Sequence, residues 1–222
     1  MKLETQCLHA GYSPESTTNS CAVPLYKTSS FVFNNTEHAA NLFGLRELGN
    51  IYTRLMNPTT DVLEQRVAAL EGGAAALGIA SGTSAVFYSI INLAQEGDEI
   101  VSANNLYGGT YTQFTDILPK FGINVKLVDP NNPANFAAAI TDKTKALFCE
   151  SVSNPGLDVA DIRAIANVAN DHGIPLIVDS TFSTPYLTNP IEHGASIVIH
   201  SLTKWMGGHG NGIGGIVVDS GT

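Results

Sequence analysis

Residues 175–204 read PLIVDSTFSTPYLTNPIEHGASIVIHSLTK and contain two short apolar runs, each followed by polar residues. PLIVD (175–179) and SIVIH (196–200) have the length and the Val/Ile content of buried strands. Asp179 closes the first run, and Lys204 follows the second within SLTKWMGGHG (201–210), a segment of hydroxyl, aromatic and glycine residues. Lysine is among the residues least often buried without a partner, so a lysine this close to a buried strand indicates a functional site.

The same pattern extends towards the N-terminus, where apolar runs alternate with segments of helical periodicity. We expect further strands at 75–80, 99–103, 124–129, 146–150 and 214–219, with helices at 81–94, 109–121, 132–140 and 161–173. Apolar strands that alternate with amphipathic helices form βαβ units. The sequence therefore predicts an α/β fold with a mainly parallel sheet and helices on both faces.

The first part of the chain has a different character. Residues 1–35 are rich in Ser, Thr, Asn and Pro and show no sustained period, so we interpret them as an extended arm that reaches over a neighbouring subunit. Helices are expected at 36–48 and 61–70. We expect two regions: an N-terminal arm and helix with inter-subunit contacts (1–60) and a large α/β domain (61–222).

Composition restricts the possible partners. Charged residues make up only 14% of the chain, against roughly 25% in typical soluble domains, which indicates a surface partly covered by other subunits or by a further domain. The net charge of −9 argues against nucleic acid as a ligand. No apolar run is long enough to span a membrane, and the three cysteines form no CxxC motif. We therefore expect free thiols, a cytoplasmic location and no membrane partner.

Polar residues with useful chemistry follow several of the predicted strands. Ligands of open α/β sheets gather beyond the carboxyl ends of the strands, so these side chains are expected to meet there. They offer a helix N-terminus with hydroxyls, an aromatic ring, an amide, a carboxylate and an amine. The candidates are Ser81, Gly82, Thr83, Tyr107, Asn154, Asp179, Ser201, Thr203 and Lys204.

Three hypotheses compete for these residues. GNGIGG (210–215) contains the GxGxxG pattern of dinucleotide sites, but an apolar strand rather than a helix follows it. SLTK (201–204) matches the SxxK pattern of serine acylases, without its SDN and KTG companions. The third hypothesis is a Schiff base between Lys204 and pyridoxal phosphate, with Asp179 on the ring nitrogen. This hypothesis accounts for the most residues, although each candidate alone could be a cap, a loop-closing acid or a surface lysine.

Several longer motifs occur together in this chain: SGTSA (81–85), YTRLMNPTT (52–60), IVDSTFSTP (177–185) and HSLTKWMGGHG (200–210). In this combination they resemble the pyridoxal-phosphate-dependent enzymes of Cys/Met metabolism. The resemblance implies the large domain of a fold-type I transferase. Within that family, SLTKW, GGHGNGIGG (207–215) and FNNTEHAANLFGL (33–45) are most similar to the O-acetylhomoserine sulfhydrylases.

The resemblance also implies a role for each candidate residue. Lys204 would carry the cofactor as a Schiff base and shuttle protons, and Asp179 would hold the pyridinium nitrogen. Tyr107 would stack on the cofactor ring, with Asn154 near its phenolic oxygen. No metal site is implied. The cofactor phosphate would lie against Ser81, Gly82, Thr83, Ser201 and Thr203, and would be reached from the neighbouring subunit by Tyr52 and Arg54.

The reaction implied by the resemblance is γ-replacement on O-acetyl-L-homoserine. Sulfide or a thiol would displace acetate and give homocysteine or methionine, as a transferase step of methionine biosynthesis. The enzyme would be a homodimer with shared active sites, assembled into a homotetramer. Alternatives are a cystathionine γ-synthase or methionine γ-lyase reaction. A further alternative is a non-catalytic pyridoxal-phosphate-binding fragment, because family members continue into a C-terminal domain that holds the substrate carboxylate.

Overall fold

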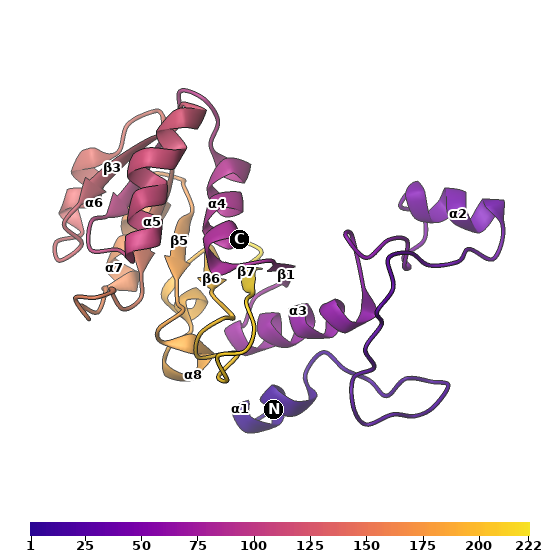
Figure 1. The fold of residues 1–222 in the computed structure, drawn as a ribbon. Coiled ribbons are helices and arrows are strands. Elements are labelled where there is room, and N and C mark those ends of the chain that lie inside the picture. Colours follow the sequence, from indigo (N-terminus) through magenta and orange to yellow (C-terminus); the bar gives the residue numbers. More distant parts are fainter. The chain divides into compact units, whose positions relative to one another are not determined.

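The computed structural model describes residues 1–222, which form two compact units, Met1–Ala69 and Leu70–Thr222 (Figure 1). The first unit contains α1 (Leu3–His9), α2 (Thr36–Phe43) and most of α3 (Pro58–Glu71). Irregular segments join these helices, and Ser30 forms an isolated antiparallel bridge with Tyr52. None of the helices of the chain is both long and apolar enough to cross a membrane.

The first unit differs from the expected extended arm in one element. α1 forms within the first 35 residues, where Glu4 in its first turn and His9 in its last turn match the helix dipole. α2 ends earlier than expected, because Gly44 caps it and Leu45 adopts a left-handed φ of 54°. α3 starts at Pro58, since proline suits the first turn of a helix.

The second unit is built on a seven-stranded sheet with the order β1-β7-β6-β5-β4-β2-β3. Strands β6, β5, β4, β2 and β3 run parallel, and β7 pairs antiparallel with both β1 and β6. The fold class predicted from the sequence is confirmed. The bounds of the strands are Ala75–Ile79 (β1), Glu99–Ala103 (β2), Asn124–Val128 (β3), Thr144–Glu150 (β4), Leu176–Asp179 (β5), Ile197–His200 (β6) and Gly215–Asp219 (β7).

Helices cover both faces of this sheet (Figure 1). The connections from β1 to β2 and from β2 to β3 run in one direction along the sheet, and those from β3 to β4 and from β4 to β5 run back. Right-handed crossovers therefore place the first two helices on one face and the next two on the other. These helices are α4 (Gly82–Leu93), α5 (Gly108–Thr112), α6 (Ala134–Ala139) and α7 (Ile162–Asp171).

Shorter helical segments complete the second unit. The helix expected at 109–121 is interrupted, and α5 passes into a π-helical turn (Gln113–Ile117) and a 3₁₀ turn (Leu118–Phe121). Pro119 lies in the last of these and cannot donate a backbone hydrogen bond. α8 (Thr184–Leu187) and a 3₁₀ turn (Pro190–His193) connect β5 to β6.

The central strands form the core. In β4 the side chains of 146–149 are all fully buried, as are the apolar residues 176–178 of β5 and 198–199 of β6. Such continuous apolar runs are expected of parallel strands that are covered on both faces. The direction of the crossovers reverses between β2 and β4, which makes the carboxyl ends of these two strands the topological switch point, where ligands of open α/β sheets bind.

Candidate active site

A cavity of about 650 Å³ lies where the sequence predicted a site. Its walls come from segments that follow β1, β2, β4, β5 and β6, all within the second unit. All nine candidates from these segments line it: Ser81, Gly82, Thr83, Tyr107, Asn154, Asp179, Ser201, Thr203 and Lys204.

The N-terminus of α4 forms one wall of the cavity. Ser81 caps the helix and accepts a hydrogen bond from the Ser84 amide at 3.1 Å. Gly82 packs directly on Ser201, and a Cβ on Gly82 would lie 2.6 Å from Ser201 Cβ and 2.9 Å from Ser201 Cα. This close approach brings backbone amides and hydroxyls together, an arrangement that suits an anion.

Gly215 supports this wall from behind. A Cβ on this first residue of β7 would lie 2.2 Å from the carbonyl oxygen of Ser81. Gly215, the last glycine of the pattern at 210–215, therefore allows a close contact between β7 and the start of α4. A strand, not a helix, follows it, so the dinucleotide hypothesis is wrong for these glycines.

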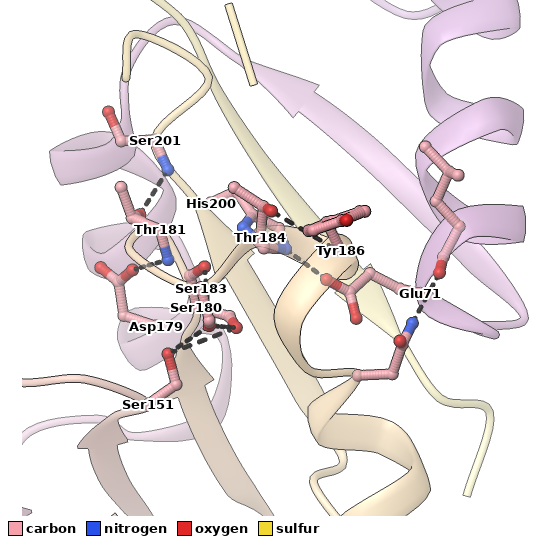
Figure 2. Close-up of polar contacts among 12 residues, drawn as sticks. Glu71, Ser151, Asp179, Ser180, Thr181, Ser183, Thr184, Tyr186, His200 and Ser201 are labelled. Atoms are coloured by element: carbon pink, nitrogen blue, oxygen red, sulfur yellow. Dashed lines mark hydrogen bonds and ion pairs between the residues drawn. The ribbon is translucent and has the colours of Figure 1, made fainter. Parts of the chain in front are cut away.

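Asp179 closes β5 and faces the same cavity. Its Oδ1 accepts a hydrogen bond from the Thr181 amide at 3.0 Å, and Thr181 Oγ1 accepts one from the Ser201 amide at 2.8 Å (Figure 2). Thr181 thus links the carboxylate to the anion wall. Burial raises the pKa of Asp179, because the protein removes water from the charged form. A cationic group in the cavity would favour the carboxylate.

Lys204 lies in the turn after β6 and is exposed along the cavity. Thr203 beside it is fixed by Gly214, since its hydroxyl donates to the Gly214 carbonyl at 3.2 Å and accepts from the Gly214 amide at 3.1 Å. The backbone of Lys204 bonds to Ser201 and Gly208. The amine is therefore carried on a well-anchored turn that lines the same cavity as Asp179 and the anion wall.

Glu150 also lines the cavity, although it was not among the residues expected from the sequence. It closes β4 and pairs in register with Asp179 of β5, so two carboxyl groups stand side by side at the strand ends. Burial raises the pKa of Glu150 to about 7, and the charge of Asp179 adds to this rise. The available signal was its position: like Asp179, it is the first polar residue after an apolar strand.

A buried pair lies behind the site. His200 Nε2 and Glu71 Oε1 are 2.5 Å apart and both side chains are fully buried (Figure 2). Beside them, Ser151, Ser180 and Ser183 join their hydroxyls at 2.7–2.8 Å through Ser183. The His200–Glu71 pair fixes the last residue of β6 against the end of α3, directly before the turn that carries Lys204, and the serine contacts join the segments that follow β4 and β5.

The two candidates from the N-terminal region, Tyr52 and Arg54, lie in the first unit. The Arg54 guanidinium carbon is 5.5 Å from the centroid of the Tyr52 ring, which is a cation–π contact. Their expected reach into a neighbouring subunit stays a prediction.

The family model described as "Cys/Met metabolism PLP-dependent enzyme" matches residues 4–222. This chain belongs to that family. The description of the family names pyridoxal phosphate (PLP) as its cofactor. Membership of this family favours the pyridoxal-phosphate hypothesis for residues 201–204 over the serine acylase hypothesis.

Two curated relatives are identical to this chain at more than half of the aligned positions, and the alignment covers about half the length of each relative. It is 57% identical over 221 residues to the O-acetyl-L-homoserine sulfhydrylase of Leptospira meyeri, covering 100% of this chain and 50% of the relative. It is 54% identical over 219 residues to the homocysteine synthase of Schizosaccharomyces pombe, covering 98% of this chain and 51% of the relative. The chain thus spans about half the length of the curated relatives it matches.

Solved structures of the family have the same fold. A Campylobacter jejuni protein described as a putative O-acetylhomoserine (thiol)-lyase, which carries N'-pyridoxyl-lysine-5'-monophosphate, matches with a TM-score of 0.96 and 43% identity. It is covered to 54%, and this chain to 99%. A cystathionine gamma-lyase from Lactobacillus plantarum, complexed with L-serine, matches with a TM-score of 0.91 and 38% identity, covering 99% of this chain and 55% of that one.

Proposed function

We propose that this chain forms the cofactor site of a pyridoxal-phosphate-dependent transferase that acts on O-acetyl-L-homoserine. Sulfide or a thiol would replace acetate at Cγ and give homocysteine or methionine. The observation that carries this proposal is the convergence of Lys204, Asp179 and the Gly82–Ser201 wall on one cavity. The similarity to an O-acetyl-L-homoserine sulfhydrylase, at 57% identity over the whole chain, supports the choice of substrate.

The donor set of the cavity fits the cofactor. The N-terminus of α4 lines the cavity together with the hydroxyl residues Ser201 and Thr203. Gly82 has no room for a side chain against Ser201, so the backbone is exposed to the cavity there, and this wall suits a phosphate. Asp179 has one oxygen bonded to the Thr181 amide, and burial raises its pKa. A cationic ring nitrogen beside this carboxyl group would oppose that rise and stabilise the carboxylate. Tyr107 is 45% exposed at the wall, where its ring is available for stacking.

Each residue then has a defined task. Asp179 would hold the proton on the ring nitrogen, and Ser201, Thr203 and the amides of Gly82 and Thr83 would bind the phosphate. Lys204 Nζ would carry the cofactor, and its amine, when free, would move protons at Cα of the substrate. Pyridoxal phosphate, when bound, supplies the electron sink for bond cleavage in the amino acid. Proton transfer by a positioned base such as Lys204 contributes about 10²–10⁴-fold to the rate.

We further propose that the assembled enzyme is a homodimer with shared sites, completed by Tyr52 and Arg54 of the neighbouring subunit, and that dimers pair into a homotetramer. We also place it in the cytoplasm. Large apolar side chains that are exposed in the monomer, such as Trp205 at 64% and Tyr186 at 77%, favour coverage by another subunit or domain. The three unpaired cysteines agree with a reducing compartment.

The first test is the visible absorbance of the chain with pyridoxal phosphate, before and after borohydride. We expect a yellow band that borohydride bleaches into a covalent adduct. Lys204→Ala should lack the adduct, whereas Lys143→Ala, at an exposed lysine of a loop outside the cavity, should keep it. An unchanged adduct in Lys204→Ala would refute the assignment of the lysine.

Product analysis tests the reaction. With O-acetyl-L-homoserine and sulfide we expect homocysteine and acetate. Keto acid formed without a nucleophile would instead support a γ-lyase, and cystathionine formed with cysteine would support a cystathionine γ-synthase. Cofactor binding without any turnover would support the interpretation as a non-catalytic pyridoxal-phosphate-binding chain.

A further inference from the structure

Glu150 connects two segments of the second unit through hydrogen bonds of its side chain. It closes β4 beside the point where the direction of the crossovers reverses, between the segments that follow β2 and β4. Its side chain bonds to both segments: Oε1 accepts the amide of Tyr107 at 2.7 Å, and Oε2 accepts the amide of Asn154 at 3.1 Å. Tyr107 lies 43 residues from Glu150 in the sequence, so this is a long-range link.

The two hydrogen bonds require two acceptor oxygens. An ionised carboxylate has both, whereas a glutamine amide has one acceptor oxygen and one donor group. With glutamine at this position, one of the two backbone amides would face another N–H group. The arrangement therefore specifies glutamate rather than a polar side chain of similar size.

The Tyr107 ring occupies space that is left free by Gly109. A Cβ on Gly109 would lie 2.5 Å from Cε1 of the Tyr107 ring, so the ring lies in the space that a side chain would fill. Tyr107 is the N-cap residue of α5, and its side chain makes no capping hydrogen bond. Glu150 holds the backbone of Tyr107, and Gly109 leaves room for its ring.

Keeping a carboxylate at this position has a cost. Glu150 is only 7% exposed and stands in register with Asp179, and burial raises its pKa to about 7. A buried carboxyl group is retained only where specific partners compensate for lost hydration. Here the partners are two backbone amides that belong to residues at the cavity wall.

We propose that Glu150 is a positioning residue that holds Tyr107 and Asn154 in the places from which they contact the cofactor. This inference rests on the proposed function, because it assigns cofactor contacts to Tyr107 and Asn154. Glu150 acts through the backbone of both residues. Loss of its two hydrogen bonds loosens the stacking ring and the amide together, although neither side chain is altered.

The experiment compares Glu150→Gln and Glu150→Ala with the unaltered chain. We expect the dissociation constant for pyridoxal phosphate to rise about tenfold in Glu150→Gln, which keeps one acceptor, and about a hundredfold in Glu150→Ala, at roughly tenfold for each 1.4 kcal/mol. The circular dichroism of the visible cofactor band, divided by its absorbance, should fall in both variants. A residue with a merely structural role would change the amount of folded protein but not this ratio.

Glu99→Gln is the matched control. Glu99 is a second partly buried glutamate, bonded to Lys126 and Thr141 at the opposite end of the parallel strands. Its substitution should leave both cofactor readouts unchanged. Wild-type affinity and an unchanged dichroism ratio in a folded Glu150→Ala chain would overturn the proposal, and Glu150→Gln decides in the same way if the alanine variant does not fold.

Hydrogen exchange separates this inference from the proposed function. In the unaltered chain without cofactor, the amides of Tyr107 and Asn154 should exchange slowly, and Glu150→Gln should accelerate at least one of them. A chain that binds no pyridoxal phosphate contradicts the proposed function, while the exchange rates still test the anchor. Equal exchange rates in the two proteins would refute the role of Glu150.

Discussion

Replacement of Gly82 by alanine introduces one methyl group at the closest contact of the site. The new Cβ would lie 2.6 Å from Ser201 Cβ and 2.9 Å from Ser201 Cα. Favourable carbon–carbon contacts lie at roughly 3.5–4.0 Å, so α4 and Ser201 would have to separate by about 1 Å. Because one of the clashing atoms belongs to the backbone, rotation of a side chain cannot relieve the contact.

Two effects of opposite sign decide the stability of Gly82→Ala. Alanine lowers the entropy of the unfolded chain and favours the helix, which stabilises by about 0.4–1 kcal/mol. Overpacking of a tight contact destabilises by about 1–3 kcal/mol. Overpacking outweighs the gain in helix stability, so we expect a net loss of about 1–2 kcal/mol in the free energy of unfolding. The displaced Ser201 should also weaken cofactor binding.

Urea denaturation measures this loss as a lower midpoint with an unchanged slope. Gly212→Ala is the matched control, because a Cβ at Gly212 would meet no atom within 4 Å. We expect the control to be as stable as the unaltered chain or slightly more stable. A Gly82→Ala chain that equals this control in stability and in cofactor affinity would refute the close contact between α4 and Ser201.

Three further perturbations test the surroundings of the site. Glu71→Ala removes the partner of the buried His200 side chain and should lower the free energy of unfolding by about 1–3 kcal/mol in urea denaturation; no loss would contradict the buried pair. Burial raises the pKa of Glu150 from 4.5 to about 7, even though its hydrogen bonds to the Tyr107 and Asn154 amides favour the carboxylate. Ionising Glu150 therefore costs more in the folded chain than in the unfolded chain, and the stability due to this group falls as pH rises between these values. Denaturation of the cofactor-free chain from about pH 5 to about pH 8 should show this fall, and Glu150→Gln should remove it. If the stability of Glu150→Gln depends on pH in the same way as that of the unaltered chain, the raised pKa of Glu150 is contradicted. Burial raises the pKa of Cys149 to about 12, so a thiol reagent at about pH 8 should modify the two exposed cysteines of the native chain and Cys149 only after denaturation.

Much of the second unit could be predicted from the sequence, because local patterns decide it. Apolar runs marked the strands, and the residues directly after them, such as Asp179 and Ser81, marked the cavity. Lys204 was found for the same reason. The antiparallel direction of β7 could not be predicted, since its residues GIVVD have the same apolar pattern as a parallel strand. The direction depends on the connection from β6, which contains no helix.

Contacts between distant residues account for what the sequence did not reveal. Glu71 and His200 are separated by 129 positions, and neither has a local signal for a partner. Glu150 ends its strand as Asp179 does, but its task depends on the Tyr107 amide 43 positions away. In the first unit, α1 was missed because a helix of seven residues is too short to establish a period.

The position of β7 between β1 and β6 has a consequence for how the chain acquires its structure. β1 is the first strand to leave the ribosome, yet its only neighbour in the sheet is β7, the last of the seven. Ala75 pairs with Asp219, so most residues of the second unit lie in the chain segment between these two partners. Pairings between residues so far apart in the sequence form slowly. Until β7 has been synthesised, both β1 and the far side of β6 expose unpaired backbone, a state prone to association with other chains. The contact of Gly215 with Ser81 forms in the same event, so the anion wall of the cavity is completed only when the final strand of the sheet enters its place.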